Sequence, residues 1–319
     1  MLFDPTAKSE AGWYAPMFLY SLHPAAFPLE KDGEEIRNTM RQIGLRNLSL
    51  EKELAGILKA LETVHVPVIL LKGCHLVQAI YPWDVRPVGD MDLLIKREDF
   101  PRAHKVIRDL GYQPWMENFP LWIHCHFSGK LTYTRSREKE PFIPLDLHFS
   151  LGPYPYLARI EPPVLWNKAR EIQINGHKAY TLCPEHLLIH LSLHLLQHTP
   201  DHWPVCGCDI AALIHHEGSR FPWEGFLVET KKAGVNRPVR FALEKVGEMF
   251  GELVPEEILN RLAKLPPGKP GWNLNLHFAC QKSEVKKYLL QFLSTPGWRA
   301  KLGCFPYILP FFLRRLKNR

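Results

Sequence analysis

The sequence predicts a mixed α/β protein of the α+β class, in which a small mixed sheet is followed by a mainly helical half. In the first half, short apolar runs bounded by proline or glycine alternate with segments of helical periodicity. From residue 184 onward, the apolar residues recur at helical spacing in one segment after another. With 319 residues and 46% hydrophobic content, the chain can bury a large core and is expected to divide into domains.

The boundaries of the predicted elements come from caps, turns and changes of period. Ser49 is expected to cap the first helix, and Lys72-Gly73 ends the first strand and opens the next helix. Asp99 and Gly111 are expected to cap and end a later helix. The predicted elements of the first half are helix 49–61, strand 66–71, helix 75–81, strand 90–95, helix 100–110, hairpin 121–135, strand 142–149 and hairpin 171–182, the last with a type I′ turn at Asn175-Gly176.

The second half is predicted to be helical, and three domains are expected along the chain. The predicted helices cover residues 184–198, 209–216, 223–232, 239–250 and 284–292. The expected domains are an N-terminal helical or irregular segment over 1–48, an α/β core over 49–182, and a helical domain over 183–319 with an aromatic and basic tail.

Charge and composition narrow the class of protein. The net charge of +7 weakly favours an anionic partner such as nucleotide, nucleic acid or lipid headgroup, although a solvated basic surface is the commoner cause. The first residues lack the basic and apolar regions of a secretory signal, and no apolar run reaches the roughly 18–20 residues of a membrane span. The seven cysteines are scattered and lack a C-x-x-C pair, which is typical of reduced thiols. We therefore expect a cytoplasmic protein.

Two acidic residues lie one residue apart in the predicted strand DMDLLI. Because strand side chains alternate between faces, Asp90 and Asp92 should point the same way. A pair of close carboxylates is tolerable when a divalent cation lies between them, and Mg²⁺ prefers oxygen ligands. Asp146 offers a third carboxylate on another strand, with His148 on the same face. Three such acids could hold two ions about 4 Å apart, the geometry that serves in-line phosphoryl transfer.

The simplest alternative is that Asp90 and Asp92 only solubilise the rim of a sheet. Their neighbours favour a site instead. A strand that ends in Lys72-Gly73 and opens into a helix presents backbone N–H groups to an anion such as phosphate. Arg86 precedes the acidic pair, although ordinary surface charge is an equally good explanation for it.

These motifs resemble those of a known family. The string LLKGCHLVQAIYPWDVRPVGDMDLLI, the later Leu-Gly-Tyr and the LDLHF motif are similar to the uncharacterised nucleotidyltransferase family, within the DNA polymerase β-like nucleotidyltransferase superfamily. The resemblance is specific over roughly residues 50–151. It extends more loosely to the histidine-rich segment, to CDIAALI and to the terminal YILPFFLRRLKN.

The resemblance implies a metal-dependent enzyme. By it, Asp90, Asp92 and Asp146 would be the catalytic and metal-binding residues, with two Mg²⁺ ions, or Mn²⁺ in their place. Gly73 would lie beneath the triphosphate of a bound nucleotide such as ATP. The superfamily usually has serine after this glycine, whereas this chain has Cys74 and a longer spacing to Asp90. The candidate nucleotide-binding residues are Lys72, Gly73, Cys74 and Arg86, with the two cations contacting phosphate oxygens.

Five histidines recur every fourth residue at the start of the second half: His186, His190, His194, His198 and His202. Neighbouring members of such a row can chelate zinc, but each step drifts by roughly 40°, so all five cannot share one site. Most are expected to be partly buried helix positions. We single out His148, His194, His198 and Asp209 as candidate contacts to nucleotide or acceptor in a cleft.

The resulting hypothesis is a Mg-dependent nucleotidyltransferase that moves a nucleoside monophosphate from an NTP to an acceptor hydroxyl and releases pyrophosphate. The base of the NTP is open, and the acceptor could be a protein, an RNA or a small molecule. The alternatives are a non-catalytic nucleotide- or RNA-binding module with the same fold and, more weakly, a histidine-based metallohydrolase. The basic aromatic tail is expected to dock on the protein itself, with peripheral membrane contact as the less favoured alternative.

Overall fold

The computed structural model describes residues 10–27, 33–115, 129–135, 143–151, 162–198 and 200–266. Its described strands form one seven-stranded mixed sheet in the order β3-β4-β5-β2-β1-β7-β6. The strands are β1 (Ile69–Leu70), β2 (Met91–Leu94), β3 (Gln113–Pro114), β4 (Lys130–Thr134), β5 (Leu145–His148), β6 (Arg170–Ile174) and β7 (His177–Thr181).

The centre of the sheet combines both strand directions. Strand β2 pairs with β5 in parallel and with β1 in an antiparallel arrangement. Strand β1 in turn pairs with β7 in parallel, and β4 pairs with β5 antiparallel. The mixed sheet predicted from the sequence is therefore confirmed.

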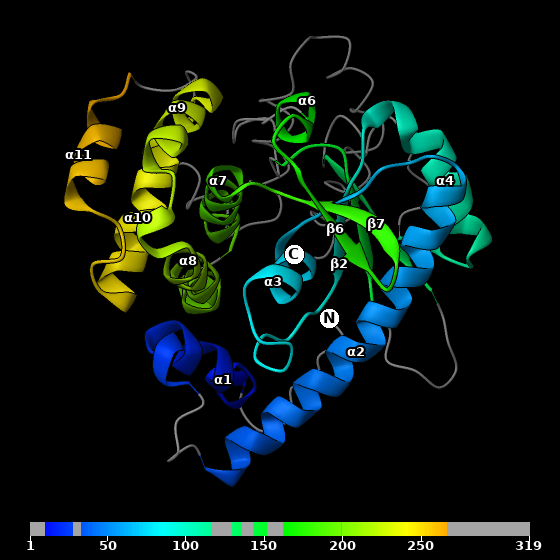
Figure 1. The fold of residues 1–319 in the computed structure, drawn as a ribbon, viewed down its shortest axis with the longest axis horizontal. Helices are drawn as coiled ribbons and strands as arrows, with labels where there is room; N and C mark the ends of the chain where they lie inside the picture. Colours follow the sequence, from blue (N-terminus) through cyan, green and yellow to red (C-terminus); the bar gives the residue numbers. More distant parts are fainter. Residues whose placement is uncertain are drawn as a thin grey trace, which may run out of the picture.

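The described helices fall into two groups, on opposite faces of the sheet (Figure 1). One face packs against α2 and α4, and the other against the helices of the second half together with α1. The α-helices are α1 (Glu10–Leu22), α2 (Glu34–Thr63), α3 (Lys72–Ala79), α4 (Phe100–Asp109), α6 (Pro162–Trp166), α7 (Pro184–Leu195), α8 (Trp203–Glu217), α9 (Trp223–Ala233), α10 (Asn236–Phe250) and α11 (Glu256–Lys264).

The two hydrophobic cores show which way the central strands face. Met91 and Leu93 belong to the core that includes α2 and α4, whereas Leu94 belongs to the core of the helical half. Since strand side chains alternate, Asp92 shares its face with Leu94. In β5, Leu145 and Leu147 likewise lie in the α2 and α4 core. The acidic residues of β2 and β5 consequently face the helical half.

The helix predicted over residues 49–61 begins earlier than expected. Helix α2 begins at Glu34, so Ser49 lies inside it and is not its N-cap, and the helix runs through the boundary expected at residues 48 and 49. The buried stripe continues upstream through Ile43 and Asn47. Asn47 is polar, so it interrupts the apolar pattern from which the helix was predicted. It is buried nevertheless, because its amide donates to the backbone oxygens of Trp83 and Arg86.

Several local predictions are confirmed. Asn175 and Gly176 have φ values of 49° and 81° between β6 and β7, as a type I′ turn requires. Gly111 follows α4 with a φ of 88°, a conformation that favours glycine. Asp99 precedes α4 as predicted, but its carboxylate pairs with Arg102 instead of capping the helix.

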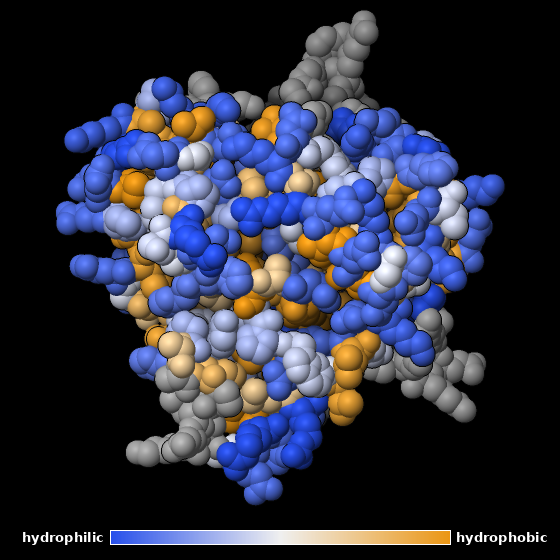
Figure 2. All heavy atoms as spheres, in the orientation of Figure 1, coloured by the Kyte–Doolittle hydropathy of each residue, from blue (hydrophilic) through white to orange (hydrophobic). Residues whose placement is uncertain are grey.

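Some predictions fall outside the described residues: the first arm of the hairpin over 121–127, the helix over 284–292 and the C-terminal tail. Figure 2 shows a surface on which hydrophilic residues predominate and hydrophobic residues occur in small groups between them. Across the described ranges, no helix combines the length and the apolar character that crossing a membrane requires.

Candidate nucleotide and metal site

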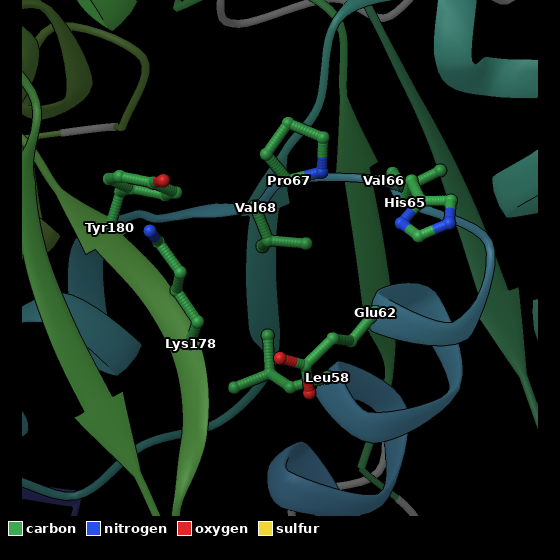
Figure 3. A pocket seen from close by; sticks show the side chains of 8 residues that line it. All are labelled: Leu58, Glu62, His65, Val66, Pro67, Val68, Lys178 and Tyr180. Atoms are coloured by element: carbon green, nitrogen blue, oxygen red, sulfur yellow. The ribbon is translucent and has the colours of Figure 1, made fainter.

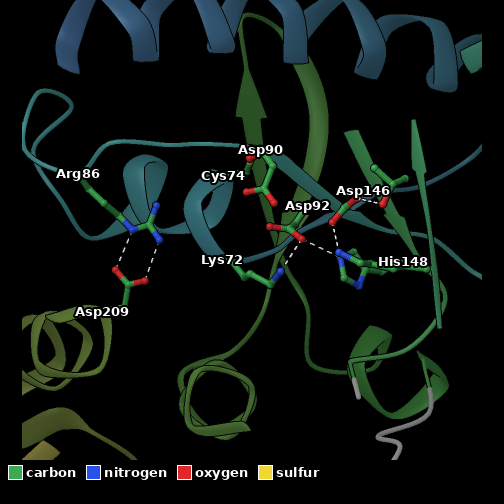
Figure 4. A network of polar contacts seen from close by, with 10 residues as sticks. Lys72, Cys74, Arg86, Asp90, Asp92, Asp146, His148 and Asp209 are labelled. Carbon is green, nitrogen blue, oxygen red and sulfur yellow. Dashed lines mark hydrogen bonds and ion pairs between the residues drawn. The ribbon is translucent and has the colours of Figure 1, made fainter. Parts of the chain in front are cut away.

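Strands β2 and β5 place two acidic residues side by side. Asp92 and Asp146 are partners in the parallel register of these strands, and both are buried. His148, two residues after Asp146, lies on the same face at the end of β5. One ligand atom from each of these three residues lies within 4.8 Å of the other two. Figure 4 shows the three side chains converging on one face of the sheet.

The Asp92 carboxylate is held by two partners. Lys72 Nζ lies 2.6 Å and His148 Nε2 lies 2.8 Å from the same oxygen, Oδ1. Burial acts to raise the pKa of Asp92, but the Lys72 ammonium and the hydrogen bond from His148 keep it well below its usual range. Burial lowers the pKa of His148. Asp92 is therefore a carboxylate at neutral pH, beside a neutral imidazole.

Asp146 has its own pair of partners on strand β4. Lys130 forms an ion pair with Asp146, and the Thr132 hydroxyl donates to Asp146 Oδ1 at 2.5 Å. Thr132 is the partner of Asp146 in the antiparallel register, so the contact follows from the strand pairing. The sequence analysis missed both residues. Their signal was the alternation of polar side chains in KLTYT, which becomes informative only once β4 is known to pair with β5.

Asp90 lies directly before β2, next to Asp92 (Figure 4). Burial and the neighbouring charge of Asp92 raise the pKa of Asp90. Lys72 and Lys130 act in the opposite direction, but more weakly. Asp90 is thus the acidic residue of the region whose charge is least compensated, and it would benefit most from an added cation.

Lys72 is the first residue of α3, and its backbone is strained. Its φ of 41° lies in the left-handed region, which is uncommon for a residue with a side chain. The preceding residue, Leu71, donates its N–H to the backbone oxygen of Asp92 at 3.0 Å, which fixes the start of α3 against β2. Burial acts to lower the pKa of Lys72, but the Asp92 and Asp90 carboxylates raise it above its usual value. The strained backbone of Lys72 thus lies at the point where its ammonium group contacts the acidic residues.

Arg86 and Asp209 form a bidentate ion pair between the α/β half and the helical half. Arg86 Nε lies 2.7 Å from Asp209 Oδ1, and Nη2 lies 2.8 Å from Oδ2. Both side chains are largely buried. Gly73 is packed beneath this guanidinium: a Cβ added to Gly73 would lie 2.6 Å from Arg86 Nη1 and 2.9 Å from a methyl carbon of Val88. The Arg86 charge is therefore already partnered by a carboxylate.

Cys74 is buried behind this region. Its Sγ lies 3.9 Å from the backbone oxygen of Asp90, and burial together with the nearby carboxylates raises the pKa of its thiol. Cys74 is a protonated thiol at neutral pH, packed in the core of the sheet. Its predicted contact with nucleotide stays a prediction.

The five histidines spaced by four residues do not share one site, as the geometry of a helix predicts. His186 pairs with Glu229, whereas the rings of His194 and His198 lie 4.6 Å apart between centroids. Cys206, which the sequence did not connect with the histidine row, joins His194 and His198 in a second group of possible metal ligands. The seven residues between His198 and Cys206 contain the turn from α7 into α8, so the contact becomes visible only once the two helices pack together.

The donor set of Asp92, Asp146 and His148 fits a divalent cation. Carboxylate oxygens are the ligands that Mg²⁺ and Mn²⁺ prefer, and the three ligand atoms are already close together. Asp90 was predicted as a third metal ligand; it lies beside this group and not within it. Lys72 and Lys130 currently supply the positive charge that balances the two carboxylates.

A separate pocket of about 240 Å³ lies between α2 and the β1–β7 region (Figure 3). His65, Pro67, Lys178 and Tyr180 are among its lining residues, and none of the predicted site residues lines it. The pocket therefore does not bear on the acidic site.

Comparison with known proteins finds two solved structures and one protein family that are similar to this chain. A nucleotidyltransferase-like antigenic protein from Paracoccidioides brasiliensis is 13% identical, with a TM-score of 0.43, over 66% of this chain and 92% of that one. JHP933 from Helicobacter pylori is 15% identical, with a TM-score of 0.35, over 77% of this chain and 97% of that one. No curated protein matches the sequence.

The family is shown by a match over most of the chain. Residues 15–251 match the family model described as uncharacterised nucleotidyltransferase. The chain belongs to this uncharacterised nucleotidyltransferase family, as its Lys-Gly, Asp-x-Asp and Asp-Leu-His motifs predicted.

Proposed function

We propose that the protein transfers a nucleoside monophosphate from an NTP to an acceptor hydroxyl and releases pyrophosphate. The observation that carries the proposal is the pairing of Asp92 and Asp146 in register on one face of the sheet, with Asp90 beside them. Membership of a nucleotidyltransferase family supports it. Two buried acids this close together, with a third beside them, are costly to keep unless positive charge compensates them.

In this proposal, Asp90, Asp92 and Asp146 hold Mg²⁺, as two ions, with Mn²⁺ as a substitute. When bound, the metal stabilises charge on the transferring phosphoryl group and lowers the pKa of the attacking hydroxyl. The hydrogen bond from His148 orients Asp92. Thr132 orients Asp146 in the same way.

The cations beside the acids have a second task. Lys72 and Lys130 neutralise Asp92 and Asp146 in the nucleotide-free protein. A metal ion held by these carboxylates would compensate their charge, and the two ammonium groups would then be in place to bind phosphate oxygens of the nucleotide. Lys130 is the more exposed of the two and can turn with little loss of packing. The start of α3 at Lys72-Gly73 adds backbone N–H groups directed toward the phosphates.

Arg86 was predicted to contact phosphate directly, and Asp209 to contact nucleotide or acceptor. We propose instead that the Arg86–Asp209 pair positions the Gly73 turn, because the guanidinium packs over Gly73 while both of its prongs bond Asp209. The partners remain an NTP, ATP included, and an acceptor that is a protein, an RNA or a small molecule. A cytoplasmic location is part of the proposal, in keeping with the free thiols of Cys74, Cys183, Cys206 and Cys208.

The second candidate function is a non-catalytic nucleotide- or RNA-binding module. The observation that favours it is that lysine ammonium groups already satisfy Asp92 and Asp146. In such a module, the lysines would stay paired and the nucleotide would bind without metal. The two functions therefore differ in whether Mg²⁺ is needed for binding.

Thermal-shift measurements with each of the four NTPs, with and without Mg²⁺, test the proposal. The transferase should be stabilised by at least one NTP only when Mg²⁺ is present, by about 2.7 kcal/mol at a ligand concentration 100 times the Kd. Asp92→Asn and Asp146→Asn should lose this stabilisation. Asp109→Asn, an exposed aspartate at the end of α4, is the matched control and should keep it. Equal stabilisation without Mg²⁺ would favour the binding module.

A further inference from the structure

The end of α7 and the start of α8 bring together three side chains that the acidic site does not use. His194, His198 and Cys206 each offer a ligand atom, and these atoms lie within 4.8 Å of one another. A tetrahedral zinc ion with Zn–N of about 2.0–2.1 Å and Zn–S of about 2.3 Å needs its ligands roughly 3.3–3.6 Å apart. Rotamer adjustments of about 1 Å would therefore close the site without moving a helix.

The local backbone holds these residues in place. His194 lies in the last turn of α7, and the chain continues in tight turns through His198, whose N–H bonds to the backbone oxygen of Leu195 at 3.2 Å. The indole of Trp203, the first residue of α8, donates to the backbone oxygen of His198 at 3.1 Å. Cys206 then follows within the first turn of α8. Both sides of the site rest on packed helices.

The surroundings of His194 and Cys206 favour metal binding. Cys206 is buried, with 7% of its surface exposed, and His194 Nδ1 is buried without a hydrogen-bond partner among the described residues. Coordination through Nδ1 would satisfy that nitrogen. Burial and the charge of Lys72 hold the pKa of His194 well below its usual value, so its ring is neutral and can act as a ligand at neutral pH.

The donor chemistry separates this group from the acidic site. Two imidazole nitrogens and one sulfur are soft or borderline donors that select zinc over magnesium, whereas Asp92 and Asp146 offer hard oxygen. Three protein ligands also leave a fourth position for water or another small ligand, as in zinc sites that are not closed by a fourth side chain.

We propose that His194, His198 and Cys206 form a transition-metal site, with zinc as its ion, that clamps the α7–α8 turn beside the nucleotide site. Binding deprotonates the Cys206 thiol: the sulfur–hydrogen bond breaks, a sulfur–zinc bond forms and the proton is released to solvent. The His194 imidazole lies within electrostatic reach of Lys72 and Asp92, so the site borders the acidic centre. The proposal is independent of nucleotidyl transfer.

Cobalt substitution of the full-length protein tests the site, because Co²⁺ bound to thiolate absorbs in the near ultraviolet through charge transfer from sulfur. The purified protein, stripped with chelator, should bind one equivalent of Co²⁺ with this band, and Zn²⁺ should displace the cobalt. Cys206→Ser should remove the band. It should also weaken Zn²⁺ binding by at least about 100-fold, because losing a residue that only hydrogen-bonds a metal ligand already costs up to about 100-fold. His198→Asn is the second, less buried variant, and it should weaken binding too.

Cys208→Ser is the matched control, since Cys208 is a buried cysteine on the same helix that is not in the group. It should keep both the band and the affinity, and so should Asp92→Asn, which removes only the acidic site. Circular dichroism of the metal-free variants confirms folding. The site is refuted if the wild type shows no thiolate band, or if Cys206→Ser and His198→Asn bind Zn²⁺ as tightly as the wild type does.

Discussion

The charge of each ionisable side chain in the acidic site depends on its own immediate partners. Asp92 remains charged because Lys72 and His148 hold it, whereas burial beside Asp92 raises the pKa of Asp90. Two neighbouring aspartates thus have opposite pKa shifts, because Lys72 and His148 bond Asp92 directly, whereas burial and the charge of Asp92 dominate at Asp90. The same reasoning applies to the buried histidines on this side of the sheet, which are held neutral.

His75 gives a pH prediction. Burial, assisted by the charge of Arg170, lowers its pKa from 6.5 to about 3, and its Nδ1 lacks a partner among the described residues. Because the unfolded chain binds a proton below about pH 6.5 and the folded chain does not, stability falls as the pH falls through this window. The loss from His75 should reach about 2 kcal/mol at about pH 5.

The test compares unfolding at neutral pH and at about pH 5. His75→Leu should lose about 2 kcal/mol less on acidification than the wild type does. His216→Gln changes an exposed histidine and should follow the wild type. If His75→Leu and the wild type lose stability equally, the folded protein accepts the His75 proton and the burial argument is wrong.

Helix α2 carries a matched pair of glycines that report on its packing. A Cβ at Gly56 would meet nothing within 4 Å, whereas a Cβ at Gly44 would lie 2.4 Å from the ring of Trp83. Since glycine costs a helix about 0.8–1 kcal/mol relative to alanine, Gly56→Ala should stabilise the protein by up to that amount. Gly44→Ala must displace Trp83 and should stabilise less or destabilise.

Urea unfolding of the two variants measures this difference. Because both sites lie in one helix, the propensity gain is the same and the contrast isolates the contact with Trp83. An equal gain in both would show that Trp83 does not pack on α2. A loss at Gly56 would show that α2 is not a continuous helix at this point.

The ion pair between Arg86 and Asp209 joins α8 to the segment before β2, and it gives a further prediction. Breaking a buried pair leaves one charge without compensation, so Arg86→Met should lower the free energy of unfolding by about 3–5 kcal/mol. Adding Asp209→Asn removes the stranded carboxylate charge and should recover part of this loss. A change below about 1 kcal/mol in the single variant would show that the pair is hydrated and contributes little.

The sequence allowed the centre of the site to be predicted, because the reasoning there is local. Asp92, Asp146 and His148 share a face through the alternation of their strands, and the structure places these side chains together, with Asp90 beside them. What could not be predicted depends on contacts between distant segments. Arg86 meets Asp209 across 123 residues, and Thr132 meets Asp146 only through the order of the strands.

The helical half shows the same limit. Spacing alone excluded a single site for five histidines, but it could not show that Cys206 would lie beside His194 and His198. That contact depends on the turn between α7 and α8 and on the packing of the two helices. The start of α2 was predicted too late for a related reason: Asn47 bonds two distant backbone oxygens, so a polar residue occupies a buried position in the stripe.

Across the whole molecule, the two faces of the sheet differ in character. The face toward α2 and α4 is an apolar core, whereas the face toward the helical half carries Asp92, Asp146 and His148. The Arg86–Asp209 pair and the start of α3 connect that face to the helices. This arrangement places the acids next to residues of both halves of the chain.

The most direct test of this account is nucleotide transfer with label on the α-phosphate. Purified protein, cell extract and each α-labelled NTP should give a labelled acceptor and pyrophosphate only with Mg²⁺, and Asp92→Asn should reduce the rate by at least about 100-fold. Label on the γ-phosphate should leave with pyrophosphate. Transfer that persists equally in Asp92→Asn, or acceptor labelled from the γ-phosphate, would contradict the account.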